Sequence, residues 1–155
     1  LELNAQPEFS IAKFIDFFVL EEDIAILHKS NFESILNYKE AHKDDFIELQ
    51  GDAEFQGVFS DLAPLVTNVG ENKIQLRRMA AIKQKAYYRS STFMSNLKDK
   101  GSDFGLNLNF DDDGKIIPCD NTWRDIIQAL LDHRLSSPFS QNIYDVPDTK
   151  TVTPA

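Results

Sequence analysis

The chain has 155 residues, of which 42% are hydrophobic and 11% aromatic, so it is long enough for one sizeable core and short for two domains. Charged residues make up 26%, and glycine and proline number 6 each, which excludes collagen-like, elastic and wholly disordered proteins. The net charge of −9 argues against indiscriminate nucleic-acid binding, because the mean field repels phosphate.

Cysteine content and hydropathy bear on the compartment. The single cysteine, Cys119, excludes an internal disulfide framework and a zinc site of several cysteines, and it fits a reducing compartment. The sequence has no run of 18 or more apolar residues, and its start lacks the basic and apolar regions of a signal peptide. We therefore expect a cytoplasmic protein. Because the sequence begins at Leu1 rather than Met, we also expect it to be a piece of a longer one.

The first part of the chain predicts a hairpin followed by short helices. The segments DFFVL, EED and IAILH predict two short buried strands joined by an acidic turn, over roughly 16–28. A serine and a glutamate at capping-box spacing predict a helix that begins near Ser30. Apolar residues between Phe46 and Leu62 predict one or two further amphipathic helices, broken around Gly51 and ended near Pro64.

Residues 72–88 predict the best-defined helix, because this segment contains no glycine or proline and many strong helix formers. At 100° per residue it has an apolar face and a basic face. Lys83 lies within the apolar arc, where its stem can be buried while its ammonium reaches water, and Ile74 lies within the basic arc. The apolar arc contains Leu76, Met79, Ala80, Ile82, Ala86 and Tyr87, and the basic arc contains Lys73, Arg77, Arg78, Ala81, Lys85 and Arg89.

Two more helices and a second hairpin are expected downstream. Ser91 or Thr92 caps a short helix that ends at Gly101. Alternating apolar residues on either side of an Asp-Asp-Asp-Gly turn predict a hairpin over 105–118. Thr122 and Asp125 have capping-box spacing before an apolar run, which predicts a helix over 122–134 with His133 and Arg134 in its last turn. From Ser136 onward the prolines and the Ser/Thr-rich end predict an irregular tail.

These elements together predict an α+β fold. We expect residues 1–147 to form a single domain, in which short antiparallel β-hairpins make a small sheet packed, mainly on one face, against four to six helices. Residues 148–155 are expected to form an irregular tail.

No motif makes a positive case for an enzyme. Asn109 to Asp120 partly matches a calcium-binding loop, but the preceding residues alternate like a strand, so we predict a plain hairpin turn and keep a calcium site as the alternative. His28, His42 and His133 lack metal-ligand spacing and are expected at the surface or at helix caps. Cys119 has no activating cation nearby in sequence, so we expect a packed thiol. The sequence therefore predicts no catalytic residue, no metal and no cofactor.

Charge is distributed very unevenly along the chain. Residues 72–100 hold 8 of the 16 lysines and arginines and only one acidic residue. A Debye length of about 8 Å at physiological salt lets such a basic patch act locally despite the overall negative charge. Two interpretations stay open: the helix contacts phosphates, or its cations form a solvated face paired with neighbouring carboxylates. Tyr87 and Tyr88 are candidates for stacking on single-stranded bases, with core packing of Tyr87 as the alternative.

Four segments resemble the B component of the Kiwa anti-phage defence system and its uncharacterised bacterial relatives. The resemblance runs from about Asp16 to Pro147 and contains no catalytic signature. The segments are NFESILNY (31–38), QLRRMAAIKQKAYYRSSTFMSNLK (75–98), LNLNFDDDGKI (106–116) and LLDHRLSSPFSQNIYDVP (130–147).

The resemblance implies DNA binding, assembly as a homodimer, and partnership with a small membrane protein that senses infection and recruits this component to the inner membrane. Members of the family are about twice as long, so the resemblance also implies the C-terminal part of a larger protein. Applied to this sequence, it supports the cations of the basic helix as residues that face DNA. Together with the basic arc, the candidate phosphate contacts are Lys73, Arg77, Arg78, Lys83, Lys85 and Arg89.

Three functions therefore remain as hypotheses. The first is a non-catalytic, sequence-independent DNA-binding module. The second is an assembly module, in which the Phe-rich stretch from Phe9 to Leu20 docks another part or a second copy, and the basic helix binds an acidic partner. The third is a nuclease-like or nucleotide-handling enzyme whose catalytic groups lie outside this sequence.

Overall fold

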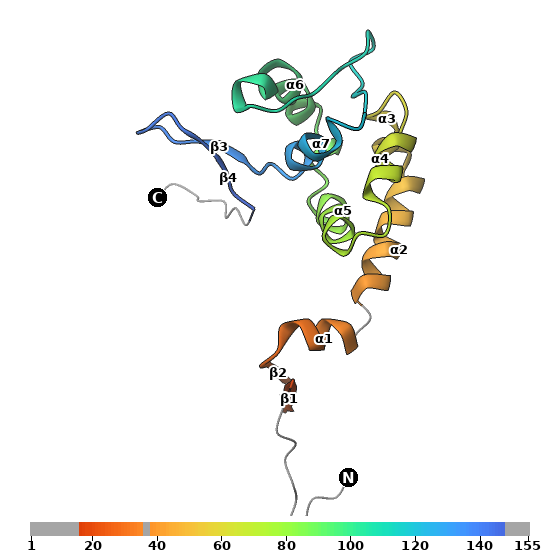
Figure 1. The fold of residues 1–155 in the computed structure, drawn as a ribbon, viewed down its shortest axis with the longest axis vertical. Helices are drawn as coiled ribbons and strands as arrows, with labels where there is room; N and C mark the ends of the chain where they lie inside the picture. The colour runs from red at the N-terminus through yellow and green to blue at the C-terminus, as the bar shows by residue number, and fades with distance from the viewer. Residues whose placement is uncertain (1–15, 36–37, 148–155) are drawn as a thin grey trace, which may run out of the picture. The chain divides into compact units, whose positions relative to one another are not determined.

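The structure is a computed structural model that describes residues 16–35 and 38–147, apart from the side chains of Phe18, Leu20 and residues 33–39. Helices and two separate pairs of antiparallel strands make up the described residues, which confirms the α+β class (Figure 1). The chain divides into two compact units, residues 1–40 and 41–155. A single domain over 1–147 stays a prediction, and the expected tail at 148–155 lies outside the described residues.

The elements follow one another closely along the chain. In order, they are β1 (Phe17–Leu20), β2 (Asp23–Ile26), α1 (Lys29–Ile35), α2 (Tyr38–Gly51), α3 (Ala53–Gly57), α4 (Ala63–Val69), α5 (Lys73–Lys85), the 3-10 helix η2 (Tyr87–Arg89), α6 (Ser91–Lys100), the 3-10 helix η3 (Gly101–Phe104), α7 (Trp123–Leu130), β3 (Arg134–Ser136) and β4 (Ile143–Asp145). Within the described ranges, no helix combines the length and the apolar character needed to cross a membrane.

The first unit contains the hairpin expected at roughly 16–28. β1 and β2 pair antiparallel, and the chain reverses where Glu21 adopts a positive φ of 53°. The expectation that both strands are buried is wrong, because Val19 and Ile24 are 58% and 53% exposed. An isolated pair of strands has two faces and can bury at most one of them against a single short helix. The ring of Phe32 from α1 packs edge-to-face on Phe17 at 5.0 Å.

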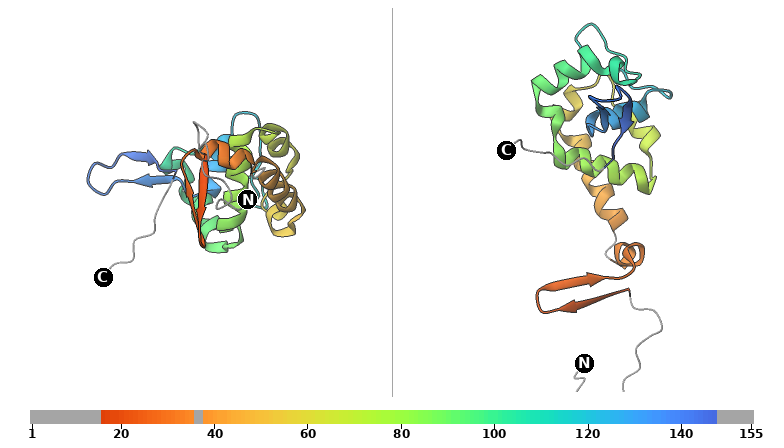
Figure 2. Two further views of the ribbon diagram at one scale, coloured as in Figure 1. Left: turned by 90° about the horizontal axis from the view of Figure 1, so that it is seen from below. Right: turned by 90° about the vertical axis from the view of Figure 1, so that its left-hand side faces the viewer.

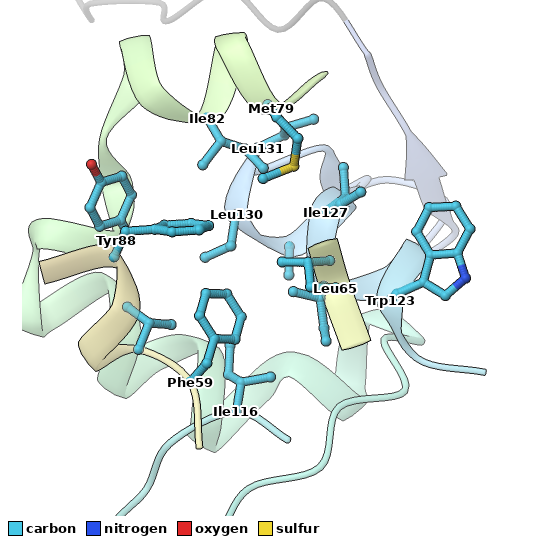
Figure 3. Close-up of a cluster of buried hydrophobic side chains, with 14 of the residues drawn as sticks. Phe59, Leu65, Met79, Ile82, Tyr88, Ile116, Trp123, Ile127, Leu130 and Leu131 are labelled. Carbon is cyan, nitrogen blue, oxygen red and sulfur yellow. The ribbon is translucent and has the colours of Figure 1, made fainter. Parts of the chain in front are cut away.

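Helix α7 lies at the centre of the second unit, surrounded by the other helices of that unit (Figures 1 and 2). Trp123, Ile126, Ile127 and Leu130 recur at i, i+3, i+4 and i+7, so they project from one side of the helix, and the three aliphatic side chains are fully buried. Burial of each aliphatic side chain of this size contributes roughly 1.5–3 kcal/mol. Figure 3 shows this cluster, in which α7 contacts Leu65, Met79, Ile82 and Ile116 from neighbouring segments.

Asp52 joins α2 to α3 and ties both to η2. Its Oδ1 caps α3 by accepting hydrogen bonds from the amides of Glu54 and Phe55 at 2.8 and 3.3 Å. Its Oδ2 accepts from the Tyr88 hydroxyl at 2.8 Å and from Arg89 Nη2 at 2.6 Å. The Arg89 guanidinium, followed by the Tyr88 hydroxyl, lowers the pKa of Asp52 to about 2. The expected break between helices around Gly51 is therefore confirmed, and its cause is the capping of α3 by Asp52.

Pro64 lies at the start of a helix, not at the end of one as the sequence suggested. It occupies the first turn of α4, where a backbone amide has no acceptor within the helix, so the lack of an N–H in proline costs no hydrogen bond. The predicted α6 is confirmed at both ends: the Ser90 hydroxyl caps it, one residue before the expected cap, and Gly101 ends it.

The hairpin expected over 105–118 is present but shorter than predicted. Gly114 adopts a φ of +80° and donates to the carbonyl of Asp111 at 3.0 Å, but only one antiparallel bridge, Phe110 with Ile116, follows. The backbone of Ile116 instead bonds to residues 58–60. The other arm turns toward α7, because Asp125 Oδ2 accepts the amide of Asn107 at 3.0 Å. The two arms still bond to each other beside the turn, since Asp111 donates to the carbonyl of Lys115 at 2.9 Å and Ile117 donates to that of Asn109 at 2.8 Å.

The capping box expected at Thr122 and Asp125 is also absent. The Thr122 hydroxyl bonds to the backbone of Cys119, and Asp125 is engaged with Asn107. Helix α7 ends at Leu130, so His133 is neither in its last turn nor at the surface: it is 7% exposed. Cys119 is half-buried and its Sγ lies 2.9 Å from Asn121 Oδ1, in keeping with the packed thiol that was expected.

Residues 134–145 form a hairpin where the sequence predicted an irregular tail. β3 and β4 pair antiparallel, with Arg134 opposite Asp145. The Ser137 hydroxyl organises the turn by accepting the amides of Phe139 and Ser140, both at 3.2 Å. This hairpin projects away from the helices of its unit (Figure 2), and Phe139 near its tip is 97% exposed.

Replacing Asp52 is expected to destabilise the second unit. Asp52→Ala removes the cap of α3 together with the partner of Tyr88 and Arg89, so we expect the free energy of unfolding to fall by about 1–2 kcal/mol in urea denaturation. Asp44→Ala, at an exposed position of α2, is the matched control and should change it little.

The same interaction predicts an acid-dependent loss of stability. The folded-state pKa of Asp52, about 2, lies below the ordinary value near 3.9, so its stabilisation is complete above that ordinary value and is lost as the pH falls toward 2. The difference in stability between the chain and Asp52→Ala should shrink over this window. A difference that stays constant from about pH 6 to pH 2 would contradict the assigned interaction.

Candidate nucleic-acid interface

The basic helix predicted from the sequence is α5, and its ends are well defined. The Asn72 side chain caps it by accepting the amides of Ile74 and Gln75 at 3.0 and 3.2 Å. Ala86 ends it in a left-handed conformation with a φ of 51°. Leu76, Met79 and Ile82 are buried, whereas Ile74 is 64% exposed, as the helical arcs predicted.

Three of the six candidate cations line one groove beside α5. We call this the basic groove; its volume is about 420 Å³. Arg77, Arg78 and Lys85 provide its charge, and Leu131 and His133, from the segment after α7, form its opposite wall. No carboxylate is among the described residues that line it, which are Ile74, Arg77, Arg78, Ala81, Lys85, Leu131, His133 and Pro147.

The two arginines of the basic groove are available for a ligand. Arg77 is exposed and Arg78 is half-buried. Neither side chain forms a hydrogen bond or an ion pair with any other residue in the described part of the chain. A guanidinium presents five donors in a planar fork that matches phosphate oxygens, so these unpaired arginines are suited to bind an anion.

Lys85 connects the basic groove to the core. Its Nζ donates to the carbonyl of Leu131 at 2.8 Å and lies 5.8 Å from the centroid of the Tyr87 ring. Leu131 is the C-terminal cap residue of α7, where backbone carbonyls lack helical partners and the helix dipole is negative. Lys85 therefore helps to fix the wall of the basic groove and still adds positive charge to it.

Lys83 is paired with the acidic face of α2. Its Nζ lies 2.7 Å from Asp45 Oδ1 and 2.5 Å from Glu48 Oε2. These two contacts, Asp45 first, raise the pKa of Lys83. A second space next to α5 contains this arrangement, with Asp45, Lys83 and His42 among its lining residues. Arg77 lines this second space as well as the basic groove, and Asp45 is the one carboxylate among the described residues that line the second space.

The remaining candidates do not line the basic groove. Arg89 forms ion pairs with Asp52 at 2.6 Å and Glu54 at 3.0 Å, and the hydrogen bond to Asp52 raises its pKa. Lys73 is exposed in the first turn of α5. The structure thus brings Arg77, Arg78 and Lys85 together in the basic groove, and it leaves Lys73, Lys83 and Arg89 outside that groove. Lys83 shares the second space with Arg77. Contact of any of these six side chains with DNA stays a prediction.

The two tyrosines are engaged in internal packing. Tyr88 is 5% exposed and its ring lies 5.2 Å from that of Phe55, with its hydroxyl bonded to Asp52. Burial, followed by the hydrogen bond to Asp52, raises the pKa of Tyr88. Tyr87 stacks on Phe93 at 5.1 Å. Neither ring is free to stack on a base in this arrangement.

The acidic turn shows no metal-binding arrangement. Asp111 Oδ1 accepts the amide of Lys115 at 2.8 Å, which is a turn interaction. Across residues 16–35 and 38–147, no three His, Cys, Asp or Glu side chains come together in a way that could hold a metal ion.

Comparison with known proteins adds the family. Residues 2–140 match the family described as Kiwa protein KwaB-like. The chain belongs to this family. It is therefore a component of anti-phage defence, and the resemblance inferred from the basic helix, the acidic turn and the DHRL segment is confirmed. No curated protein and no solved structure matches the chain.

Sequence reasoning missed the second wall of the basic groove. Leu131 and His133 are separated from α5 by more than 40 residues, and nothing in their local pattern indicates a functional surface. The one usable signal was the long apolar stripe of α7, which had to pack on the apolar arc of α5 and so brings the end of α7 close to Lys85.

Substitutions of ion-paired cations should lower the stability of the fold, whereas substitution of an unpaired cation should not. We expect Lys83→Gln and Arg89→Gln to lower the melting temperature by about 2 °C each, because each leaves two carboxylates without their partner. Arg77→Gln should leave it unchanged. Thermal unfolding followed by circular dichroism measures these melting temperatures. An equal decrease for all three variants would show that the ion pairs of Lys83 and Arg89 do not contribute to stability.

Proposed function

We propose that this chain is a non-catalytic DNA-binding module of an anti-phage defence protein, and that Arg77, Arg78 and Lys85 contact the phosphate backbone. The observation that carries the proposal is the basic groove: three cations face one space, no described carboxylate lines it, and the two arginines are unpaired. Membership of the KwaB-like family supports a role in defence.

The spacing of the cations supports contact with more than one phosphate. Arg78 and Lys85 are seven residues apart, which corresponds to about 10 Å along the helix axis and places them two turns apart on one side of it. Arg77 adds a guanidinium at one end, and Lys85 is held at the other by Leu131. A linear array of this kind suits successive phosphates of a backbone, and phosphate contacts carry no sequence information. Binding is therefore expected to be independent of sequence.

Packing of the tyrosines favours backbone contact over base stacking. The lining of the basic groove contains no aromatic residue, and Tyr87 and Tyr88 are used in the core. Proteins that hold single strands without sequence preference combine a basic groove with exposed aromatic rings. Among its described lining residues, the basic groove has the charge but no phenylalanine, tyrosine or tryptophan ring.

The overall charge of −9 fits weak, salt-dependent binding. Carboxylates of α2, of α3 and of Asp52 between them neutralise Lys83 and Arg89, whereas the cations of the basic groove have no carboxylate among its described lining residues. With a Debye length of about 8 Å, this local field attracts phosphates that are already close and adds little long-range steering.

DNA titrations at several salt concentrations test the proposal. The double variant Arg77→Gln/Arg78→Gln should weaken binding by about tenfold at low salt and reduce the slope of log K against log salt by about 1.8, because two phosphate contacts are lost. Fluorescence anisotropy with a labelled duplex measures both quantities.

Lys83→Gln is the control, since it removes one positive charge from the same helix but from a paired side chain. It should leave the slope unchanged. Unaltered affinity in the double variant would refute the assignment of DNA binding to the basic groove. An equal loss of affinity in Lys83→Gln would show that the whole helix α5, and not the basic groove alone, contacts DNA.

The exposed hairpin supports a second candidate, an assembly role. Phe139 is 97% exposed, and Leu135 and Tyr144 on the two strands are 43% and 47% exposed. Apolar side chains gathered on a projecting hairpin favour contact with another protein surface. We propose that this hairpin binds a second copy of the chain, and that the resulting homodimer also docks a small membrane protein. The stretch from Phe9 to Leu20, considered for this role from the sequence, lies mostly outside the described residues.

Analytical ultracentrifugation tests this second candidate. We expect a concentration-dependent dimer that Phe139→Ser weakens by about tenfold or more, since truncation of an exposed aromatic anchor removes a large part of a small interface. Ile47→Ser, at a 56% exposed position of α2, is the control and should leave the equilibrium unchanged. A monomer at all concentrations would speak against self-assembly.

A further inference from the structure

A second, smaller cavity lies among α6, η3, α7 and β3. We call it the α6–α7 cavity; its volume is about 240 Å³. Its inner wall is apolar and comes from buried or half-buried side chains, among them Phe93, Leu97, Phe104 and Leu106. The volume is close to the lower end of small-molecule sites, which are about 300–1,000 Å³. The α6–α7 cavity therefore has room for a body about the size of one ring.

Polar groups converge at the mouth of the α6–α7 cavity. Lys100 is exposed and makes no hydrogen bond or ion pair with other residues in the described ranges. Arg134 lies opposite, on β3, and Asn96 contributes an exposed amide from α6. Asp132 is the one carboxylate among the described lining residues, so the mouth carries two positive charges and one negative charge.

Arg134 is held in place by its neighbours. Its Nε and Nη2 donate to Gln128 Oε1 at 3.0 and 2.6 Å. Gln128 in turn donates through Nε2 to Asp145 Oδ2 at 3.1 Å, on the strand paired with β3. This chain of bonds fixes the guanidinium on the cavity and leaves its Nη1 without a bond to the described residues. A donor that is fixed beforehand loses little entropy when a ligand binds.

We propose that the α6–α7 cavity binds a small aromatic carboxylate. The apolar wall with Phe93 and Phe104 fits a planar ring, and offset or edge contacts between rings are favourable there. The surplus of one positive charge at the mouth matches a monoanion better than a doubly charged phosphate. Lys100 supplies the mobile cation, and Arg134 and Asn96 supply oriented donors.

Titration of the full chain with benzoate tests the site directly, using ¹H–¹⁵N correlation spectra. We expect binding in the millimolar range, as for other ligands of this size, with shifts confined to residues of α6, η3, α7 and β3. Lys100→Gln should weaken benzoate binding up to about fivefold, because a solvent-exposed ion pair is lost. Neutral benzamide has the same shape and should bind equally to both forms.

Two further variants keep the result decisive. Asn96→Phe places a ring at the mouth from an exposed position, so it should abolish binding of benzoate and benzamide without unfolding the chain, which the same spectra report. Lys98→Gln removes a charge from α6 outside the cavity lining and should bind benzoate as the unaltered chain does. Shifts that survive Asn96→Phe, or no saturable shift at up to about 50 mM benzoate, would overturn the proposal.

Discussion

The fold of the second unit depends on the burial of α7. This eight-residue helix is too short to be stable alone in water, and its apolar side chains are covered on several sides. Helices α3, α4 and α5 each contribute buried side chains to the same cluster. The positions of the surface groups follow from this packing, because the apolar arc of α5 can meet α7 only if its basic arc faces away from the core. Lys85 then reaches the carbonyl at the end of α7.

The acidic character of the protein determines which cations are exposed for binding. Helices α2 and α3 carry the carboxylates that engage Lys83 and Arg89, and these contacts also connect the helices of the unit. Among the described residues that line the basic groove, no carboxylate is present. A strongly negative chain thus keeps a local positive surface in the basic groove, a pattern that net charge alone does not reveal.

Sequence patterns predicted the elements whose cause is local. The helices α5 and α6, the end of α6 at Gly101, the break around Gly51, the first hairpin and the Gly114 turn all follow from residues within a few positions of each other. The errors arose where distant groups compete for the same partner. Asp125 accepts the amide of Asn107 and does not cap its own helix. Ile116 bonds to residues 58–60 as well as bridging Phe110, so the second hairpin stays short.

The candidate site was predicted only in part for the same reason. The helical period placed Arg77, Arg78 and Lys85 on one side of α5, and the structure brings these three together. The same period assigned Arg89 to the basic arc, but the helix ends at Ala86, and the turn that follows directs Arg89 to Asp52. Carboxylates more than thirty residues away decided which cations stayed unpaired.

The four residues after α7 form a partition between two spaces. Leu131 and His133 line the basic groove, whereas Asp132 and Arg134 line the α6–α7 cavity. Asp132 has a φ of 57°, a left-handed conformation that is costly for a residue other than glycine and persists only where the surroundings impose it. So short a stretch cannot move on one side alone. If a ligand in the α6–α7 cavity changes the affinity of the basic groove for its own ligand, then the ligand of the basic groove changes the affinity of the cavity by the same factor.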